Sequence, residues 1–163
     1  SDIIGDDDTS RHLIDQYTDI VKGISNTTTV CEFTSSSKHR DKILCDFANG
    51  DLEVLTSMKC LDEGVDVPRS EMAVFCASTG NPRQFIQRRG RILRKHKDKY
   101  HAVIHDLIVA PIINSAAENF NMERRLLEME MKRVRDFASL SENADFTYTE
   151  LDDITTYYNI NIL

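Results

Sequence analysis

Amphipathic helices alternate with short apolar strands from residue 9 to residue 110, and no other feature constrains the fold as strongly. Apolar residues spaced by threes and fours predict a helix that is capped by Thr9 or Ser10 and ends near Ile24. A second helix is predicted from about Ser37 to the stop signal Asn49-Gly50. Strand-forming runs lie at 29–33, 52–56, 72–77 and 102–109. Short connections between such elements predict an α/β fold, in which a parallel sheet carries helices on both faces. The apolar side of the first helix is predicted to be Leu13, Ile14, Tyr17, Ile20, Val21 and Ile24.

The pattern changes after Pro111, where helical periodicity replaces the alternation. Ser115-Ala-Ala-Glu118 has the form of a capping box and predicts a helix that continues to about Leu140. A second capping box, Thr147-Tyr-Thr-Glu150, predicts the start of a short final helix. One side of the longer helix is apolar, which indicates packing on its own domain; docking on another lobe or subunit is the alternative. The predicted apolar side consists of Phe120, Leu127, Met131, Val134 and Ala138.

Composition excludes several classes of protein. The 163 residues are 40% hydrophobic and 29% charged, which is typical of a globular domain. No apolar run approaches the roughly 20 residues that cross a bilayer, so we expect a soluble, cytoplasmic protein without a membrane partner. The four cysteines form no CxxC pair, and we predict buried free thiols and no metal site. His101 and His105 lie on a predicted strand, where their spacing would not bring them together around a metal ion.

Basic residues are concentrated in one segment. Residues 83–99 contain eight Lys or Arg and one Asp, a formal charge of +7, in a chain whose net charge is −7. A basic edge on an acidic body can attract a phosphate-bearing ligand, because local potential steers such a ligand more than net charge does.

Two stretches of the chain are distinctive, Thr56-Ser-Met-Lys-Cys-Leu-Asp-Glu-Gly-Val-Asp-Val-Pro68 and Gln84-Phe-Ile-Gln-Arg-Arg-Gly-Arg-Ile-Leu-Arg94. In this order they resemble motifs V and VI of superfamily 2 helicases. The resemblance spans about residues 29–110 and implies the second, C-terminal RecA-like lobe of a DEAD/DEAH-type motor. Within that superfamily the chain most resembles restriction and phage-defence motors, which would favour double-stranded DNA as the track.

The resemblance also implies a domain organisation. Residues 9–112 would form the RecA-like lobe, and residues 113–163 a helical C-terminal extension. Residues 1–8, which include four Asp, are expected to be a disordered start or not native to the chain.

Arg91 and Arg94 are the predicted catalytic residues. Asn81-Pro82 predicts the start of a helix that continues to Leu93, so residues three apart near its end would share a face. Fixed guanidinium groups stabilise the charge that spreads over a transferring phosphoryl group. The resemblance implies that these two arginines are fingers that reach a nucleotide across a cleft; the alternative is a solvated helix face.

Three further residues are implied to touch the nucleotide. They are Gly64, Asp66 and Gln87, with Asp66 accepting a hydrogen bond from a ribose hydroxyl and Gln87 coupling the nucleotide to the lobe interface. The alternative for Gly64 and Asp66 is a tight turn.

Hydroxyl-bearing residues near two strand ends are implied to bind nucleic-acid phosphates. Thr56 and Ser57 match motif V, and their alternative role is to cap a strand end. Thr34, Ser35, Ser36 and Arg40 could extend that track, although Ser37 stands where many relatives have glutamine. Contacts of this kind fix position along a strand without reading its sequence.

The sequence contains no GxxxxGK[ST] phosphate loop and no acidic strand-end motif for magnesium. We therefore expect ATP with Mg²⁺ to be bound mainly by an N-terminal RecA-like partner lobe, and this chain alone to be inactive. Its expected partners are that lobe and DNA or RNA. The alternative function is a nucleotide-independent nucleic-acid-binding or scaffolding lobe.

Overall fold

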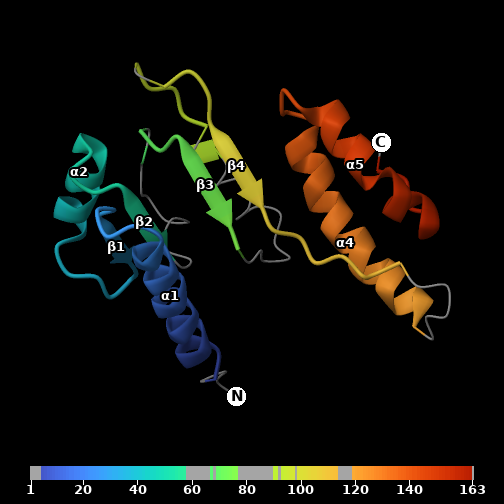
Figure 1. The fold of residues 1–163 in the computed structure, drawn as a ribbon, viewed down its shortest axis with the longest axis horizontal. Coiled ribbons are helices and arrows are strands. Elements are labelled where there is room, and N and C mark those ends of the chain that lie inside the picture. The colour runs from blue at the N-terminus through green and yellow to red at the C-terminus, as the bar shows by residue number, and fades with distance from the viewer. Residues whose placement is uncertain are drawn as a thin grey trace. The chain divides into compact units, whose positions relative to one another are not determined.

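The computed structural model describes residues 5–57, 67, 69–76, 90–91, 93–97, 99–113 and 119–162, with side chains from residue 13 onward. Figure 1 shows the helices and strands of these parts. They are, in chain order, α1 (Gly5–Ile24), β1 (Val30–Phe33), α2 (Arg40–Asn49), β2 (Val54–Ser57), β3 (Met72–Phe75), β4 (Val103–Asp106), α4 (Phe120–Ala138) and α5 (Ala144–Tyr157). Contacts divide the chain into two units, residues 1–73 with 83–105 and residues 74–82 with 106–163.

In the first unit, β1 and β2 form a parallel pair with a helix on each face. Val30 pairs with Val54 and Phe33 with Ser57. Neighbouring residues of a strand point to opposite faces. Thr56 of β2 contacts α1, whereas Leu55 packs with Phe33 and the apolar residues of α2. The predicted parallel pairing, covered on both faces, is therefore confirmed for these two strands.

Only part of the predicted apolar side of α1 is buried. Ile14 and Thr18 face the strands, with exposures of 5% and 1%. Ile20 and Ile24 are 60% and 79% exposed, so the buried face of this helix is narrower than its apolar side. A threonine lies at the centre of the buried face because its hydroxyl donates to the Ile14 carbonyl one turn earlier, at 2.8 Å.

The predicted stop signal of α2 is confirmed. Gly50 adopts a left-handed conformation, with φ of 88°, and its amide donates to the Phe47 carbonyl at 3.2 Å. The Arg69 guanidinium donates to the Ala48 carbonyl at 2.9 Å, where a positive charge also favours the carbonyl end of a helix. The end of α2 is thus fixed by a glycine and by an arginine from further along the chain.

β3 and β4 form a second pair. The Val103 amide donates to the Glu71 carbonyl at 2.8 Å, and the Leu107 amide donates to the Phe75 carbonyl at 3.0 Å. These bonds advance in the same direction along both strands, as in a parallel pair. Both strands are shorter than the predicted segments 72–77 and 102–109.

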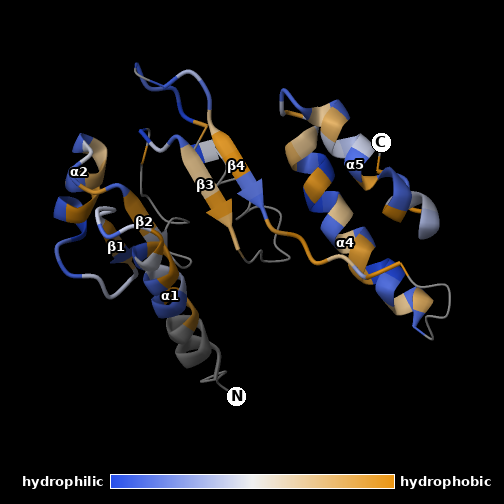
Figure 2. Cartoon of the chain, viewed as in Figure 1, coloured by the Kyte–Doolittle hydropathy of each residue, from blue (hydrophilic) through white to orange (hydrophobic). Residues whose placement is uncertain are grey.

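The second unit contains an α4–α5 hairpin with its own core. The buried cluster consists of Leu127, Met131, Val134, Tyr158 and Ile162. The predicted apolar side of α4 is confirmed, and it packs within its own unit. Figure 2 shows hydrophobic and hydrophilic residues alternating around α4, as expected for a helix with one buried side. The Tyr158 hydroxyl donates to Glu123 Oε2 at 2.8 Å; burial, with this bond, raises the pKa of Tyr158 to about 12.

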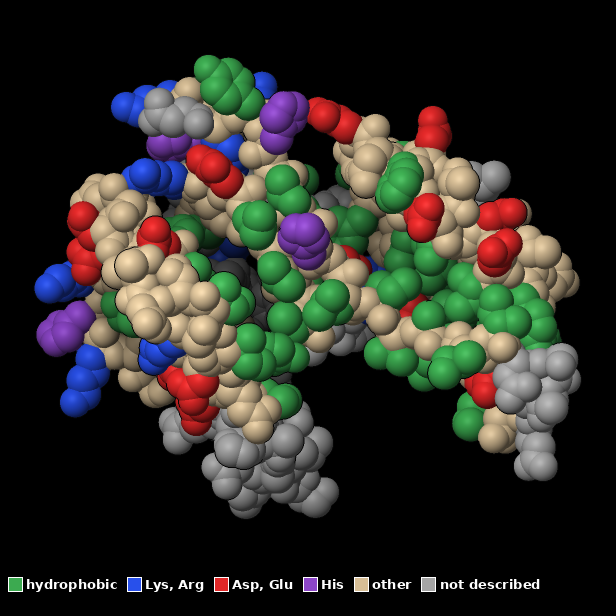
Figure 3. Space-filling view, viewed as in Figure 1, with side chains coloured by type: hydrophobic (Ala, Val, Ile, Leu, Met, Phe, Trp, Pro, Cys, Tyr) green, Lys and Arg blue, Asp and Glu red, His purple; other side chains and the backbone are tan. Residues whose placement is uncertain are grey.

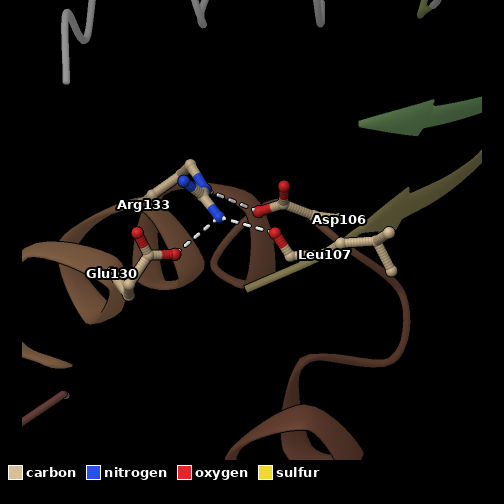
Figure 4. A network of polar contacts seen from close by, with 4 residues as sticks. All are labelled: Asp106, Leu107, Glu130 and Arg133. Carbon is tan, nitrogen blue, oxygen red and sulfur yellow. Dashed lines mark hydrogen bonds and ion pairs between the residues drawn. The ribbon is translucent and has the colours of Figure 1, made fainter. Parts of the chain in front are cut away.

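An ion-pair network joins α4 to the end of β4 (Figure 4). Arg133 Nε donates to Asp106 Oδ2 at 2.8 Å, and Arg133 NH2 lies 2.7 Å from Glu130 Oε2. The same guanidinium donates to the Leu107 carbonyl at 3.2 Å. Burial raises the pKa of Asp106, although the bond to Arg133 lowers it. One arginine therefore connects two carboxylates and a backbone carbonyl.

Several predicted boundaries differ from the structure. Residues 5–8 belong to α1, which therefore begins before the predicted cap at Thr9 or Ser10. The capping box at Thr147 is also wrong, because α5 begins at Ala144 and the Thr147 hydroxyl donates to the Asn143 carbonyl at 3.2 Å. The capping box at 115–118 lies outside the described residues. The second unit consists of residues 74–82 and 106–163, and the division into a lobe at 9–112 and an extension at 113–163 stays a prediction.

Cysteine burial is only partly as predicted. Cys31, Cys45 and Cys76 are free thiols, and Cys45 is exposed, because it lies on the outer side of α2. Within the described helices, none has the length and apolar character that crossing a membrane requires.

Candidate functional site

The carboxyl ends of β1 and β2 meet at one edge of their sheet. Because the strands are parallel and Phe33 pairs with Ser57, the loop after β1 and the end of β2 emerge side by side. Binding loops of parallel sheets lie at this edge. The structure therefore brings together the two segments predicted to bind nucleic acid, residues 34–40 and residues 56–57.

The loop after β1 is held by its own hydroxyl groups. The Thr34 amide donates to Ser37 Oγ at 2.8 Å, and Ser37 Oγ donates to the Glu32 carbonyl at 3.3 Å. Thr34 Oγ1 lies 3.0 Å from Ser36 Oγ. Ser35 is exposed at the turn. These bonds give the loop a defined shape without a ligand and leave Ser35 facing solvent.

Arg40 begins α2 and lies over an aromatic ring. His39 adopts a left-handed conformation, with φ of 56°, which turns the chain into the helix. The Arg40 guanidinium carbon is 4.7 Å from the centroid of the Phe33 ring, within the range of a cation–π interaction. Phe33 is 0% exposed. The predicted phosphate-binding arginine is therefore supported by a buried ring.

Thr56 and Ser57 point to opposite faces of β2, so the structure separates two hydroxyls that the sequence suggests as a pair. Thr56 Oγ1 lies 2.6 Å from Thr18 Oγ1. Since the single hydroxyl hydrogen of Thr18 goes to the Ile14 carbonyl, Thr56 is the donor of this bond. Ser57 Oγ is buried and has no hydrogen-bond partner in the described structure.

The downstream end of the motif V stretch is anchored. Val67 is 7% exposed and packs with Phe33, and the Ser70 amide donates to the Val67 carbonyl at 3.0 Å. Gly64, Asp66 and Gln87 lie outside the described residues. Their nucleotide contacts stay predictions.

Arg91 and Arg94 differ in their surroundings. Gly90 and Arg91 are helical and Arg91 is half-buried, whereas Arg94 is exposed and lies beyond the helical residues. The expectation that one helix face carries both arginines is therefore corrected, since Arg94 is not helical. Their role as arginine fingers stays a prediction.

Lys99 ends the basic segment and is anchored to the backbone. Its Nζ donates to the Ser70 carbonyl at 3.1 Å. Burial lowers the pKa of Lys99, while the charge of Glu71 raises it. Lys99 thus links the segment before β4 to the segment before β3.

Two contributors to this edge are not recognisable in the sequence. In the sequence, Phe33 is predicted only as the last apolar residue of a strand. No spacing rule predicts its contact with Arg40, which lies on the other side of a loop. Thr18 is a polar residue on an apolar helix face, and only the position of Thr56 reveals its partner. In the described part of the chain, no three His, Cys, Asp or Glu side chains are grouped so that they could hold a metal ion.

Comparison with known proteins adds the family. The Helicase conserved C-terminal domain family matches residues 9–96. The DNA 3'-5' translocase XPB2 of Sulfurisphaera tokodaii is 34% identical over 99 residues, which are 61% of this chain and 21% of that protein. Dicer-like protein 2 of Pyricularia oryzae is 27% identical over 116 residues, 71% of this chain and 8% of that protein. The chain thus spans about a fifth or less of the length of these relatives.

Among solved structures, the Mss116p DEAD-box helicase domain 2 bound to an RNA duplex is similar to 92% of this chain. The match covers 64% of that chain, with a TM-score of 0.47 and 13% sequence identity.

The family match covers more than half of the chain and includes both stretches that resemble helicase motifs. The parallel pairing of β1 and β2, with helices before and between them, agrees with the predicted α/β class. The chain belongs to the Helicase conserved C-terminal domain family, as the C-terminal lobe of a superfamily 2 helicase.

Proposed function

We propose that this chain is the second motor lobe of an ATP-dependent superfamily 2 helicase or translocase that moves on DNA or RNA. The family match over residues 9–96 carries the proposal, because it includes both motif-bearing segments. The edge formed by the loop after β1 and the end of β2 supports it, since that edge places hydroxyl groups and an arginine where parallel sheets bind ligands.

In this proposal, Arg91 and Arg94 act on a nucleotide held by an N-terminal RecA-like lobe. ATP with Mg²⁺ would bind mainly to that lobe, and the arginines would neutralise charge on the phosphoryl group as the two lobes close. The exposure of Arg94 suits a side chain that must reach outside its own lobe. Gly64, Asp66 and Gln87 would complete the contacts to the nucleotide from this side.

Strand contacts in this proposal come from Thr34, Ser35, Arg40 and Ser57. The Ser57 hydroxyl, buried without a partner, has a donor to offer if its surroundings open. Thr56 would contribute indirectly, because its hydroxyl hydrogen is already bonded to Thr18. The name of XPB2 as a DNA translocase supports DNA as the track, and duplex DNA in a cytoplasmic, restriction-type motor is our specific proposal.

The test uses the two-lobed protein, in which this chain is joined to its N-terminal lobe. ATP turnover is measured without nucleic acid, with duplex DNA and with duplex RNA. We expect DNA to stimulate turnover, and the 163-residue chain alone to show none. Turnover that responds to neither nucleic acid would refute the motor function.

The basic segment favours a second candidate, a scaffolding lobe that holds nucleic acid without a nucleotide. Its described basic residues are Arg91, Arg94, Lys95, Lys97 and Lys99. Such a lobe would bind strands with a steep salt dependence, through counterion release, and an ATP analogue would not change the affinity. A change in strand affinity on addition of the analogue selects the motor.

A further inference from the structure

Phe33 and Arg40 form a stacked pair at the proposed strand-binding edge. The ring is fully buried, and the guanidinium carbon is 4.7 Å from its centroid. A guanidinium that stacks through its face still presents its N–H donors in its plane, where they can bind a phosphate. A ring at this distance can therefore restrict the directions in which Arg40 donates.

The surroundings of Arg40 favour an anion. An open hollow is lined by Ser37, His39, Arg40, Asp41 and Lys42, which are mainly basic or polar. Among the described residues, no carboxylate forms an ion pair with Arg40. Figure 3 shows Lys, Arg and His side chains, together with Asp and Glu side chains, projecting near the position of α2. Arg40 thus lines a hollow in which a hydroxyl group and basic side chains, beside the acidic Asp41, are available to a phosphate group.

Phe33 also packs against the downstream end of the motif V stretch. Val67 is 7% exposed and belongs to the same buried cluster as Phe33. Ile43, Leu44, Phe47 and Leu55 pack around the two. Cores respond to displacement by repacking because they are densely filled. A shift of Val67 would therefore reach the ring on which Arg40 rests.

We infer that Phe33 is a positioning residue, whose ring aims the Arg40 guanidinium at a backbone phosphate and links that contact to the segment ending at Val67. The inference rests on the proposed function and deepens it. It adds a residue that touches neither nucleic acid nor nucleotide and acts through Arg40.

A double-mutant cycle in the two-lobed protein tests this inference. The variants are Phe33→Leu, Arg40→Ala and both together, and the matched control is Phe47→Leu in the same cluster. Binding of a short fluorescent duplex DNA is measured over a range of salt concentrations, and thermal unfolding is recorded for each variant. Arg40→Lys serves as a surface variant that keeps the charge but loses the planar stack, and it leaves the core intact.

We expect Arg40→Ala to weaken binding roughly tenfold and to reduce the salt slope by about one. Phe33→Leu should weaken binding roughly threefold in the wild-type background and not at all in the Arg40→Ala background. Arg40→Lys should bind more weakly than wild type, and Phe47→Leu should bind like wild type even if it unfolds earlier.

Equal losses from Phe33→Leu in both backgrounds, or wild-type binding by Arg40→Lys, would overturn the inference while wild-type strand binding still supports the motor. If the wild-type protein does not bind DNA, the proposed function fails first, and the inference fails with it.

Discussion

Among the described glycines, Gly50 is the one whose backbone conformation disfavours a side chain. Its φ of 88° lies in the left-handed region, and an added Cβ would be 2.8 Å from the Arg69 guanidinium. We predict that Gly50→Ala lowers the free energy of unfolding by roughly 1–2 kcal/mol, measured by urea denaturation. The matched control is Gly23→Ala within α1, where nothing lies within 4 Å of the new Cβ. That control should raise stability by roughly 0.5–1 kcal/mol, and losses of equal size at both sites would refute the account.

Thr18 joins α1 to β2 through its hydroxyl. Thr18→Val keeps the shape of the side chain but leaves the Thr56 hydroxyl, which is 2.6 Å away in the wild type, without its acceptor. We predict a loss of roughly 1–2 kcal/mol in the free energy of unfolding. Thr18→Ser should retain most of the stability because it keeps the hydroxyl. A Val variant as stable as wild type would show that the bond contributes nothing.

Sequence reasoning succeeds for residues whose local pattern fixes their geometry. The Asn49-Gly50 stop is predicted because only glycine easily takes the left-handed conformation after a helix. Thr18 and Phe33 are missed because their roles depend on partners distant in sequence, on β2 and across a loop. Of the predicted site residues, Thr34, Ser35, Arg40 and Ser57 gather at one sheet edge, as strand-end positions imply.

The α4–β4 connection depends on Arg133. Asp106 and Arg133 have side chains only 13% and 11% exposed, so removing the arginine leaves a nearly buried carboxylate unpaired. We predict that Arg133→Met destabilises the protein by roughly 3 kcal/mol at neutral pH. The comparison variant is Arg124→Met on the same helix. Its ion pair with Glu128 joins side chains that are 39% and 45% exposed, and should contribute less than about 1 kcal/mol.

The pH dependence of this effect has a definite sign. Burial already raises the pKa of Asp106 above its ordinary 3.8, and loss of Arg133 removes the interaction that lowers it. In the variant, Asp106 of the folded state therefore takes up a proton at a higher pH, in the window above 3.8. The loss of stability relative to wild type consequently becomes smaller as the pH falls. Urea unfolding at a series of pH values measures this, and a deficit independent of pH would contradict it.

Tyr158, which directly follows α5, makes the stability of the folded chain depend on pH in the alkaline range. Its pKa is raised to about 12 in the folded state, from an ordinary value of 10.0. Between these values the unfolded chain loses a proton that the folded chain keeps, so this contribution to stability falls as the pH rises. We predict that Tyr158→Phe is less stable than wild type at neutral pH, and that the difference in melting temperature narrows above about pH 10. If the melting temperatures of wild type and variant differ by the same amount at every pH up to 12, the raised pKa of Tyr158 does not explain the difference.

At the level of elements, a strong helical periodicity predicts that a helix exists more reliably than it predicts where the helix begins and ends. The stripe along α4 is read correctly because its buried residues recur at helical spacing over several turns. The start of α5 is missed because Thr-x-x-Glu also occurs inside helices, where the threonine hydroxyl bonds to a carbonyl four residues earlier. The shorter β3 and β4 show that apolar runs extend beyond the residues that actually pair.

For the whole molecule, the fold can be predicted from the sequence, whereas the proposed site would be divided between two lobes. Alternating helices and strands, together with the two motif-like stretches, suffice to predict the helicase C-terminal domain that the family match confirms. Nucleotide contacts are harder to predict, because arginine fingers act on a ligand held by another lobe. The separation of Thr56 from Ser57 also follows from strand alternation once the boundary of β2 is known.

The most direct measurement is strand-stimulated ATP turnover by the two-lobed protein carrying Arg91→Ala or Arg94→Ala. Arg125→Ala, at an exposed position on α4, is the matched control. We predict that each finger variant reduces turnover roughly a thousandfold, while the control turns over like wild type. Unchanged turnover in both finger variants would contradict the assignment of this chain as the lobe that supplies the arginine fingers.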